Sequence, residues 1–233
     1  MPHRLVICTP SASGLKRVET DQGSYALWRE AIQLGFQTGP PVTVQKALIW
    51  KARRDLYRLA LENHADYLLF MDDDMVPPPR ALTALYTAIQ QGPWAIVSGL
   101  CVLRSEQGRF SVSWRDPDGI FDDQPSDLPG EDVMEVNGFG MAFCLLDLAR
   151  CQRITGIPDQ KDARKNPFFP FLLEDSPNGL GEDLAFCHRI RAGGGRLALH
   201  GGVHPGHLFL LELKAGPIIQ ARREMLLAAS IKR

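Results

Sequence analysis

The chain has 233 residues, of which 45% are apolar, and 26 basic side chains nearly balance 27 acidic ones. This length and composition are typical of a packed globular protein with one large domain or two small ones. The balanced charge argues against nucleic acid as a partner, because binding to a phosphate backbone needs a strongly positive face.

Targeting and disulfide signals are weak. No apolar run approaches the ~20 residues that span a bilayer, and the apolar stretch at residues 5–8 is too short for a signal-peptide core. The five cysteines are odd in number and scattered, and they form no Cys-x-x-Cys pair. These features favour reduced core thiols over disulfides or a thiolate zinc site. We therefore expect a cytoplasmic protein with no integral membrane segment.

The first 100 residues alternate predicted strands with predicted helices. Residues 4–9 read as a buried strand and residues 20–36 as a helix, followed by a brief strand at 42–44. Apolar residues at helical spacing indicate a helix over 45–63, which leads into an apolar strand at 66–71. A proline run then precedes a helix at 81–90 and a strand at 94–98. This alternation predicts an α/β fold with a parallel sheet.

The second half is less regular. Residues 104–131 are rich in Gly, Asp, Pro and Ser and contain one possible short strand at 110–114. Residues 133–146 predict strand, turn and strand, and the proline-containing loop at 155–181 is of a length typical of a functional lid. A helix at 182–192 ends at three glycines, a strand at 196–199 follows, and 217–231 predicts an amphipathic terminal helix.

An acidic triplet follows the apolar strand at 66–71. Asp72, Asp73 and Asp74 come where that strand ends, which is where open α/β sheets bind ligands. Strand alternation would put Asp72 and Asp74 on one side and Asp73 on the other. Adjacent carboxylates repel, by roughly 4 kcal/mol at a partly buried site, so a divalent cation would stabilise them. The alternative is a solvated acidic turn before a helix.

Two more carboxylates begin the helix at 182–192. Asp183 starts the apolar stripe of this helix, whereas Glu182 heads a more mixed face. A carboxylate at the buried edge of a first helical turn is suited to act as a general base. Simple compensation of the helix dipole is the alternative interpretation for both residues.

Three histidines, His200, His204 and His207, lie within eight residues after the last predicted strand. Neutral imidazole is a good ligand for Mn²⁺ or Zn²⁺, and the Gly and Pro residues around them indicate a loop able to bend toward a site. A site made only of histidines is less favoured, because no helix aligns two of them.

The order of these features resembles the GT-A fold glycosyltransferases, especially family 2 and its relatives. The resemblance is carried by the acidic triplet, by the segment Val136–Ala142 with its two glycines, by the string Gly181 to Phe186, and by Gly206-His207. It extends over roughly residues 4–207. It implies a single Rossmann-like domain with a mostly parallel sheet flanked by helices. Residues 4–100 would be the nucleotide-binding half, 101–210 the acceptor and catalytic half, and 211–233 a helical tail.

The resemblance also implies roles for individual residues. Asp74 would be the principal ligand of Mn²⁺ or Mg²⁺, completed by His207 or His204, while Asp72 would bind metal or nucleotide. Asp183, with Glu182, would supply the catalytic base. The remaining donor-binding positions would be Thr9, Pro10, Arg53, Asp73, Gly138 and Gly140.

Three readings follow for function. The first is an inverting, non-processive transfer of a sugar from a nucleotide-diphosphate sugar to a hydroxyl of a carbohydrate, lipid or protein acceptor. The second is a nucleotidyltransferase acting on a sugar phosphate, although the segment 11–17 has only one Gly beside Lys16 and Arg17. The third is an inactive nucleotide-sugar binding module. The terminal helix could pack on the domain, pair with another chain or touch an anionic membrane, and packing on the domain is the default expectation.

Overall fold

The computed structural model describes residues 2–12, 14, 16–45, 47–102, 110, 112–115, 121–122, 130–158, 165–173 and 176–208. The terminal helix expected at 217–231 lies outside these residues. In the described part of the chain, no helix is both long and apolar enough to cross a membrane. The division of the chain into functional halves stays a prediction.

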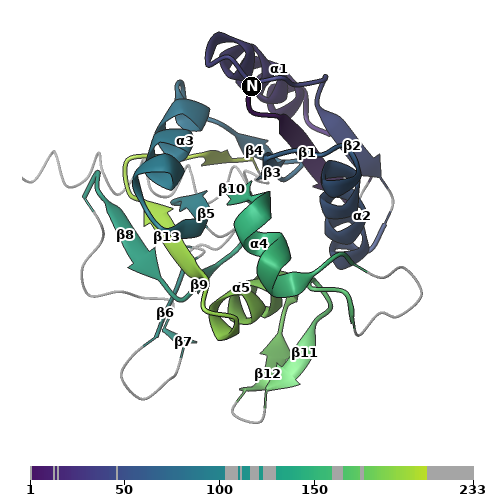
Figure 1. Ribbon diagram of the computed structural model, residues 1–233, viewed down its shortest axis with the longest axis vertical. Helices are drawn as coiled ribbons and strands as arrows, with labels where there is room; N and C mark the ends of the chain where they lie inside the picture. Colours follow the sequence, from purple (N-terminus) through teal and green to yellow (C-terminus); the bar gives the residue numbers. More distant parts are fainter. Residues whose placement is uncertain are drawn as a thin grey trace, which may run out of the picture.

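A mixed sheet forms the centre of the molecule (Figure 1). Over the described residues it has seven strands in the order β2-β1-β3-β10-β5-β13-β8. One direction is shared by β1 (Leu5–Ser11), β2 (Val42–Gln45), β3 (Tyr67–Met71), β5 (Trp94–Gly99) and β13 (Arg196–His200). The opposite direction is taken by β8 (Val133–Val136) and β10 (Phe143–Asp147). The expected α/β fold with a mostly parallel sheet is confirmed.

Helices cover both faces of this sheet. One face carries α1 (Val18–Gln33) and α3 (Ala81–Gln91), and the other carries α2 (Ile49–Glu62), α4 (Leu148–Thr155) and α5 (Glu182–Ala192), as Figure 1 shows. Strand alternation divides the core accordingly: Leu5 and Ile7 pack on the α1 side, whereas Cys8 packs on the α2 side. Every residue of β3 is buried, as its continuous apolar run predicts.

Three small sheets surround the central one. β4 (Met75–Val76) pairs with β14 (Gly206–His207), and β11 (Phe171–Leu173) pairs with β12 (Ser176–Leu180). β6 (Val112–Arg115) lies between β7 (Phe121–Asp122) and β9 (Gly138–Phe139). The β4–β14 pair matters most for the site, because it joins the turn after β3 to the chain after β13.

Two features of the second half go beyond what the sequence predicted. The strands expected over 133–146 form, but β8 pairs with β13 while β10 inserts antiparallel between β3 and β5. Their partners are distant in sequence, so local alternation could not reveal them. The helix α4 was not expected; the Asp147 side chain caps it by accepting a hydrogen bond from the Arg150 backbone at 2.9 Å.

Candidate active site

The acidic triplet forms a turn between β3 and β4. The backbone N–H of Met75 donates to the Asp72 carbonyl at 3.2 Å, and the Asp72 N–H donates to the Ala142 carbonyl at 2.8 Å. The expected strand alternation therefore does not apply, because the chain turns at these residues. Each carboxylate instead has its own partner on a different element.

Arg53 is the partner of Asp72. Its side chain, on α2, is only 1% exposed, and Nη2 lies 3.2 Å from Asp72 Oδ1. Nη1 donates to the Met141 carbonyl at 2.9 Å, and the guanidinium carbon lies 5.5 Å from the ring centre of Phe70. A cation this deeply buried needs carboxylates around it to offset the loss of hydration.

The same guanidinium reaches the carboxylates of α5. Arg53 Nε lies 3.1 Å from Asp183 Oδ1 and 3.9 Å from Glu182 Oε1. One buried arginine thus links the acidic triplet after β3 to the acidic pair that starts α5. These two motifs are more than a hundred residues apart, and both belong to the candidate site proposed from sequence.

Charge and burial shift the ionisation of this cluster. The pKa of Asp72 is raised to about 7, chiefly by burial; Arg53 opposes the rise, and Asp183, Asp73 and Glu182 add to it. Burial also raises the pKa of Glu182, with Asp183 adding to the shift. Burial alone would lower the pKa of Arg53, but Asp183, Asp72 and Glu182 outweigh it, so the pKa is raised and the arginine stays charged.

Asp74, the residue before β4, meets His207 of β14. His207 Nε2 lies 3.4 Å from Asp74 Oδ2, and the Leu208 backbone N–H donates to the Asp74 carbonyl at 2.8 Å. The other imidazole nitrogen, Nδ1, lies 2.7 Å from the Val102 carbonyl. Asp74 is 5% exposed. The contact expected between the third aspartate and the last histidine is therefore present.

The donor set suits a metal that takes only a few protein ligands. Among the residues that the structure describes, no three His, Cys, Asp or Glu side chains form a group that could hold a metal. Asp74 and His207 nevertheless bring one carboxylate oxygen and one imidazole nitrogen together. Mg²⁺ and Mn²⁺ commonly complete such sites with phosphate oxygens and water, so the pair fits a site finished by a diphosphate.

A pocket of about 250 Å³ opens at the triplet. It is lined by Pro10, Ala12, Ile49, Asp72, Asp73, Asp74 and His207. Asp73 lies in its wall and accepts a hydrogen bond of 2.5 Å from Ser11 Oγ at the end of β1. Thr9 is fully buried on the other face of β1, so Pro10 is the one of the two that reaches this pocket.

The glycine-containing segment Val136–Ala142 lies behind the site. Gly138 belongs to β9, and Gly140 precedes Met141 and Ala142. The Met141 carbonyl accepts a hydrogen bond from Arg53, and the Ala142 carbonyl accepts one from the Asp72 backbone N–H. His204 lies elsewhere: it is exposed on the turn after β13, and its Nε2 hydrogen bonds with the Gly201 carbonyl.

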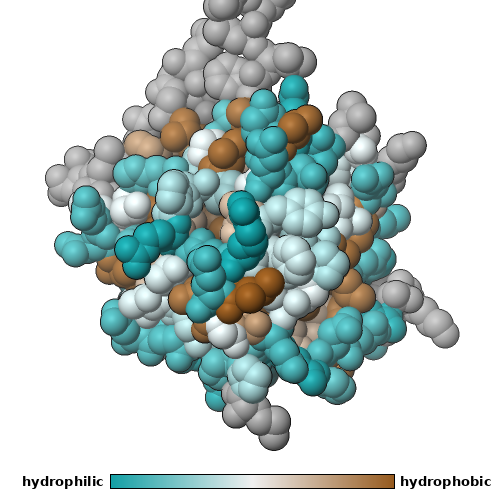
Figure 2. All heavy atoms as spheres, turned by 90° about the horizontal axis from the view of Figure 1, so that it is seen from above, coloured by the Kyte–Doolittle hydropathy of each residue, from teal (hydrophilic) through white to brown (hydrophobic). Residues whose placement is uncertain are grey.

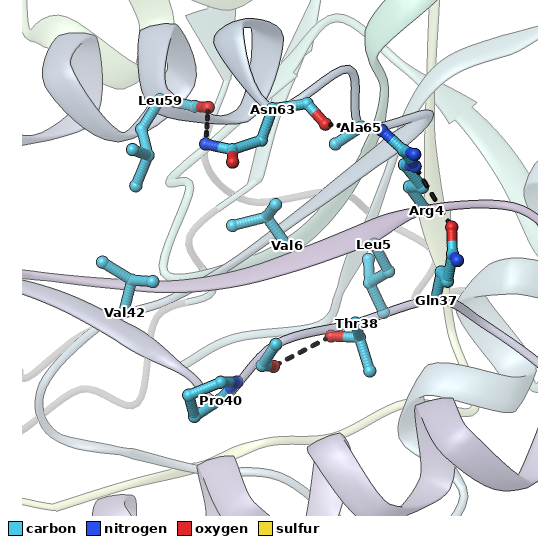
Figure 3. A pocket seen from close by; sticks show the side chains of 11 residues that line it. Arg4, Leu5, Val6, Gln37, Thr38, Pro40, Val42, Leu59, Asn63 and Ala65 are labelled. Atoms are coloured by element: carbon cyan, nitrogen blue, oxygen red, sulfur yellow. Dashed lines mark hydrogen bonds between the residues drawn. The ribbon is translucent and has the colours of Figure 1, made fainter.

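A larger cavity, of about 610 Å³, lies between β1, β2 and the end of α2 (Figure 3). Its lining is mostly apolar, and its polar rim is internally bonded: Arg4 donates to Gln37 Oε1 at 3.2 Å and to the Asn63 carbonyl at 3.3 Å. None of the residues lining it carries a carboxylate or imidazole. The smaller pocket at the triplet therefore remains the better candidate for chemistry.

The comparisons support the fold. No protein-family model matches the chain, and no curated protein matches it. Among solved structures it is similar to A197 from STIV, with a TM-score of 0.55 and 18% identity over 89% of this chain and 86% of that one. It is also similar to GalNAc-T7, crystallised with UDP, GalNAc and Mn²⁺, with a TM-score of 0.50 and 11% identity. That match covers 90% of this chain but only 45% of the GalNAc-T7 chain.

Proposed function

We propose that this chain is a metal-dependent glycosyltransferase that moves a sugar from a nucleotide-diphosphate sugar to an acceptor hydroxyl. The observation that carries the proposal is the contact between Asp74 and His207 beside the Asp72–Arg53–Asp183 cluster. Carboxylates from the turn after β3 and from α5 and an imidazole from β14 converge near the end of the parallel strand β3. Ligands bind at this edge in open α/β sheets.

Asp74 and His207 are the residues that would hold Mn²⁺ or Mg²⁺. When bound, the cation would neutralise the negative charge of the departing nucleoside diphosphate. Pro10 and Ala12 would line the nucleotide side of the pocket, and Asp73, fixed by Ser11, would contact the nucleotide. The similarity to GalNAc-T7 supports this role, because that protein was crystallised with UDP and Mn²⁺.

Asp183 is our choice for the base that removes the proton from the acceptor hydroxyl. Its carboxylate is 24% exposed and is oriented by Arg53 Nε at 3.1 Å, so it combines access with a fixed position. Glu182 lies 3.9 Å from the same nitrogen and is the second candidate. If the acceptor hydroxyl, deprotonated by Asp183, attacks the anomeric carbon from the face opposite the departing diphosphate, the anomeric configuration inverts.

The test of catalysis compares two matched variants. Asp183→Asn should keep metal-dependent nucleotide binding but lose transfer and donor hydrolysis by roughly 10²-fold or more, the usual contribution of a general base. Glu182→Gln should keep most of the rate if Asp183 is the base. The reverse pattern would move the role to Glu182, and full activity in both variants would overturn the proposed site.

The test of binding is a thermal-shift screen of nucleoside diphosphates with and without Mn²⁺. A ligand at 100 times its dissociation constant stabilises the folded state by about 2.7 kcal/mol. His207→Ala should abolish the Mn²⁺-dependent part of this shift, whereas His204→Ala, which removes an exposed imidazole three residues away, is the matched control. An equal loss in both variants would contradict the role of His207.

The same assays separate the other two readings. Release of pyrophosphate from a nucleoside triphosphate and a sugar phosphate would indicate a nucleotidyltransferase. Lys16, the lysine available near the N-terminus, already donates to Ser24 Oγ at 2.8 Å and pairs with Asp21 at 3.0 Å, which disfavours a triphosphate role. Nucleotide binding without turnover over a broad panel of donors and acceptors would indicate a binding module.

A further inference from the structure

The cavity of about 610 Å³ is not used by the proposed activity. It lies beside the first residues of β1 and the last turn of α2, and Figure 3 shows Val6, Val42 and Leu59 around it. Because β1 and β3 run parallel, this cavity at the start of β1 and the acidic triplet after β3 lie at opposite ends of the strands. On the face that Figure 2 shows, apolar side chains are scattered among polar ones, as is usual for a protein surface. The cavity is therefore a separate, concave apolar surface.

The cavity arises where the chain before β2 separates from β1. The two segments touch at an isolated bridge between Arg4 and Gln37, and they pair regularly only from Cys8 and Val42 onward. The intervening segment 38–41 contains two consecutive prolines, which have no N–H to donate to β1. The ladder therefore cannot continue through this segment, and the end of α2 borders the space that is left.

Arg4 places one positive charge at the rim of this cavity. Its Nε donates to Gln37 Oε1 at 3.2 Å and its Nη1 donates to the Asn63 carbonyl at 3.3 Å, and both acceptors are neutral. Asp66 accepts a hydrogen bond from the backbone N–H of Arg4 at 2.6 Å and does not line the cavity. Within the part of the chain that the structure describes, no carboxylate forms an ion pair with the Arg4 guanidinium, and Nη2 makes no hydrogen bond. The rim therefore offers a held cation with donors to spare.

We propose that this cavity binds a small apolar carboxylate, with its hydrocarbon part against Val6, Val42 and Leu59 and its carboxylate on Arg4. The volume and the mostly apolar lining with few polar groups are those of a small-molecule site. A carboxylate fits better than a phosphate, because Arg4 supplies one positive charge whereas a phosphate monoester carries nearly two negative ones. No lining residue belongs to the candidate active site, so failure of one proposal would leave the other standing.

Isothermal titration of the full-length chain with sodium octanoate, below its micelle concentration, tests the proposal. We expect saturable binding of one molecule per chain. Octan-1-ol has the same hydrocarbon length without the charge and should bind about tenfold more weakly, the ratio expected for one charge-assisted hydrogen bond. Acetate keeps the charge without the hydrocarbon and should also bind at least about tenfold more weakly. Binding of octanoate that does not saturate, or equal affinity for octanoate and octan-1-ol, would overturn the proposal.

Two pairs of variants locate the site. Arg4→Gln should remove the preference for octanoate over octan-1-ol, whereas Arg29→Gln, which removes another exposed charge from α1, should leave it unchanged.

Val42→Phe should fill part of the cavity and weaken both ligands by about tenfold or more. Thr43→Phe, one residue along β2 and so on the opposite face of the strand, is the matched control. Octanoate binding that is unchanged in Val42→Phe, or lost equally in Arg4→Gln and Arg29→Gln, would place the ligand elsewhere and contradict the assignment.

Discussion

The buried side chain of Arg53 contacts most of the carboxylates of the candidate site. Three carboxylates, those of Asp72, Glu182 and Asp183, lie within 3.9 Å of its guanidinium nitrogens. The arrangement keeps the acidic groups close together before any cation binds. The stability of the protein therefore depends strongly on Arg53, because removing one partner of a buried ion pair leaves an uncompensated charge in the interior.

We expect Arg53→Leu to lower the free energy of unfolding by about 3–5 kcal/mol, the usual cost of breaking a buried ion pair. Urea denaturation of both proteins measures the change. Arg58→Leu is the matched control on the same helix: Arg58 is 32% exposed and pairs with Glu62 at 2.6 Å, so its loss should cost no more than about 1 kcal/mol. Equal losses would mean that Arg53 does not hold the cluster together.

The burial of all five cysteines leads to a second prediction. Burial raises the pKa of Cys8, Cys101, Cys144, Cys151 and Cys187, so little thiolate is present near neutral pH. We expect none of the five to react rapidly with a thiol reagent at pH 8 in the folded protein, and all five to react in guanidinium chloride. A fast thiol in the folded protein would indicate local opening of the core.

The individual site residues could be predicted only in part from sequence. The acidic triplet, the pair at 182–183 and His207 were found from their positions after strands or at a helix start, and His207 does contact Asp74. The family resemblance implies a donor-binding role for Arg53, whereas in the structure its guanidinium contacts carboxylates, a carbonyl and an aromatic ring. No local pattern identifies the partners of a buried arginine that are 130 residues away.

At the scale of elements, periodicity predicted most helices and strands but not which strands pair. The strands at β1, β3, β5 and β13 and the helices α1, α2, α3 and α5 form close to their expected ranges. The insertion of β10 between β3 and β5 depends on contacts between distant segments. The short β4–β14 pair, which brings His207 to Asp74, is likewise invisible to a local pattern.

The turn from α5 to β13 has no room for a side chain at Gly195. A Cβ at Gly195 would lie 2.6 Å from Ile190 Cγ2, 2.8 Å from Ile154 Cδ1 and 3.0 Å from the Ile190 carbonyl oxygen. Gly195→Ala should therefore destabilise the protein by about 1–3 kcal/mol through overpacking. Since α5 carries Glu182 and Asp183, activity should fall as well. Gly39→Ala, where a Cβ meets nothing within 4 Å, is the control and should change stability by less than about 0.5 kcal/mol. Equal effects would contradict the packing argument.

At the scale of the whole molecule, the candidate site joins the two ends of the described chain. β3 and the acidic triplet come from the first half, while α5 and β14 come from the second. Arg53 bridges the halves through buried ion pairs, and Asp74 bridges them through His207 and the Leu208 N–H. The connection between β4 and β14 is the weaker one, because these strands share only two residue pairs. A ligand that binds both halves should therefore stabilise this connection most.

Hydrogen exchange can test this coupling. Without ligand, amides of Gly206, His207 and Leu208 should exchange much faster than those of β3 and β10, which are central in the sheet and buried. A nucleoside diphosphate with Mn²⁺ at saturating concentration should slow exchange at 206–208 by about tenfold or more, since local opening would then require release of the ligand. Asp74→Asn should abolish this slowing, while the edge strand β8, on the far side of the sheet, should exchange alike with and without ligand. Protection confined to the first half of the chain would mean that His207 takes no part in binding, and that nucleotide and metal are held by the segment after β3 alone.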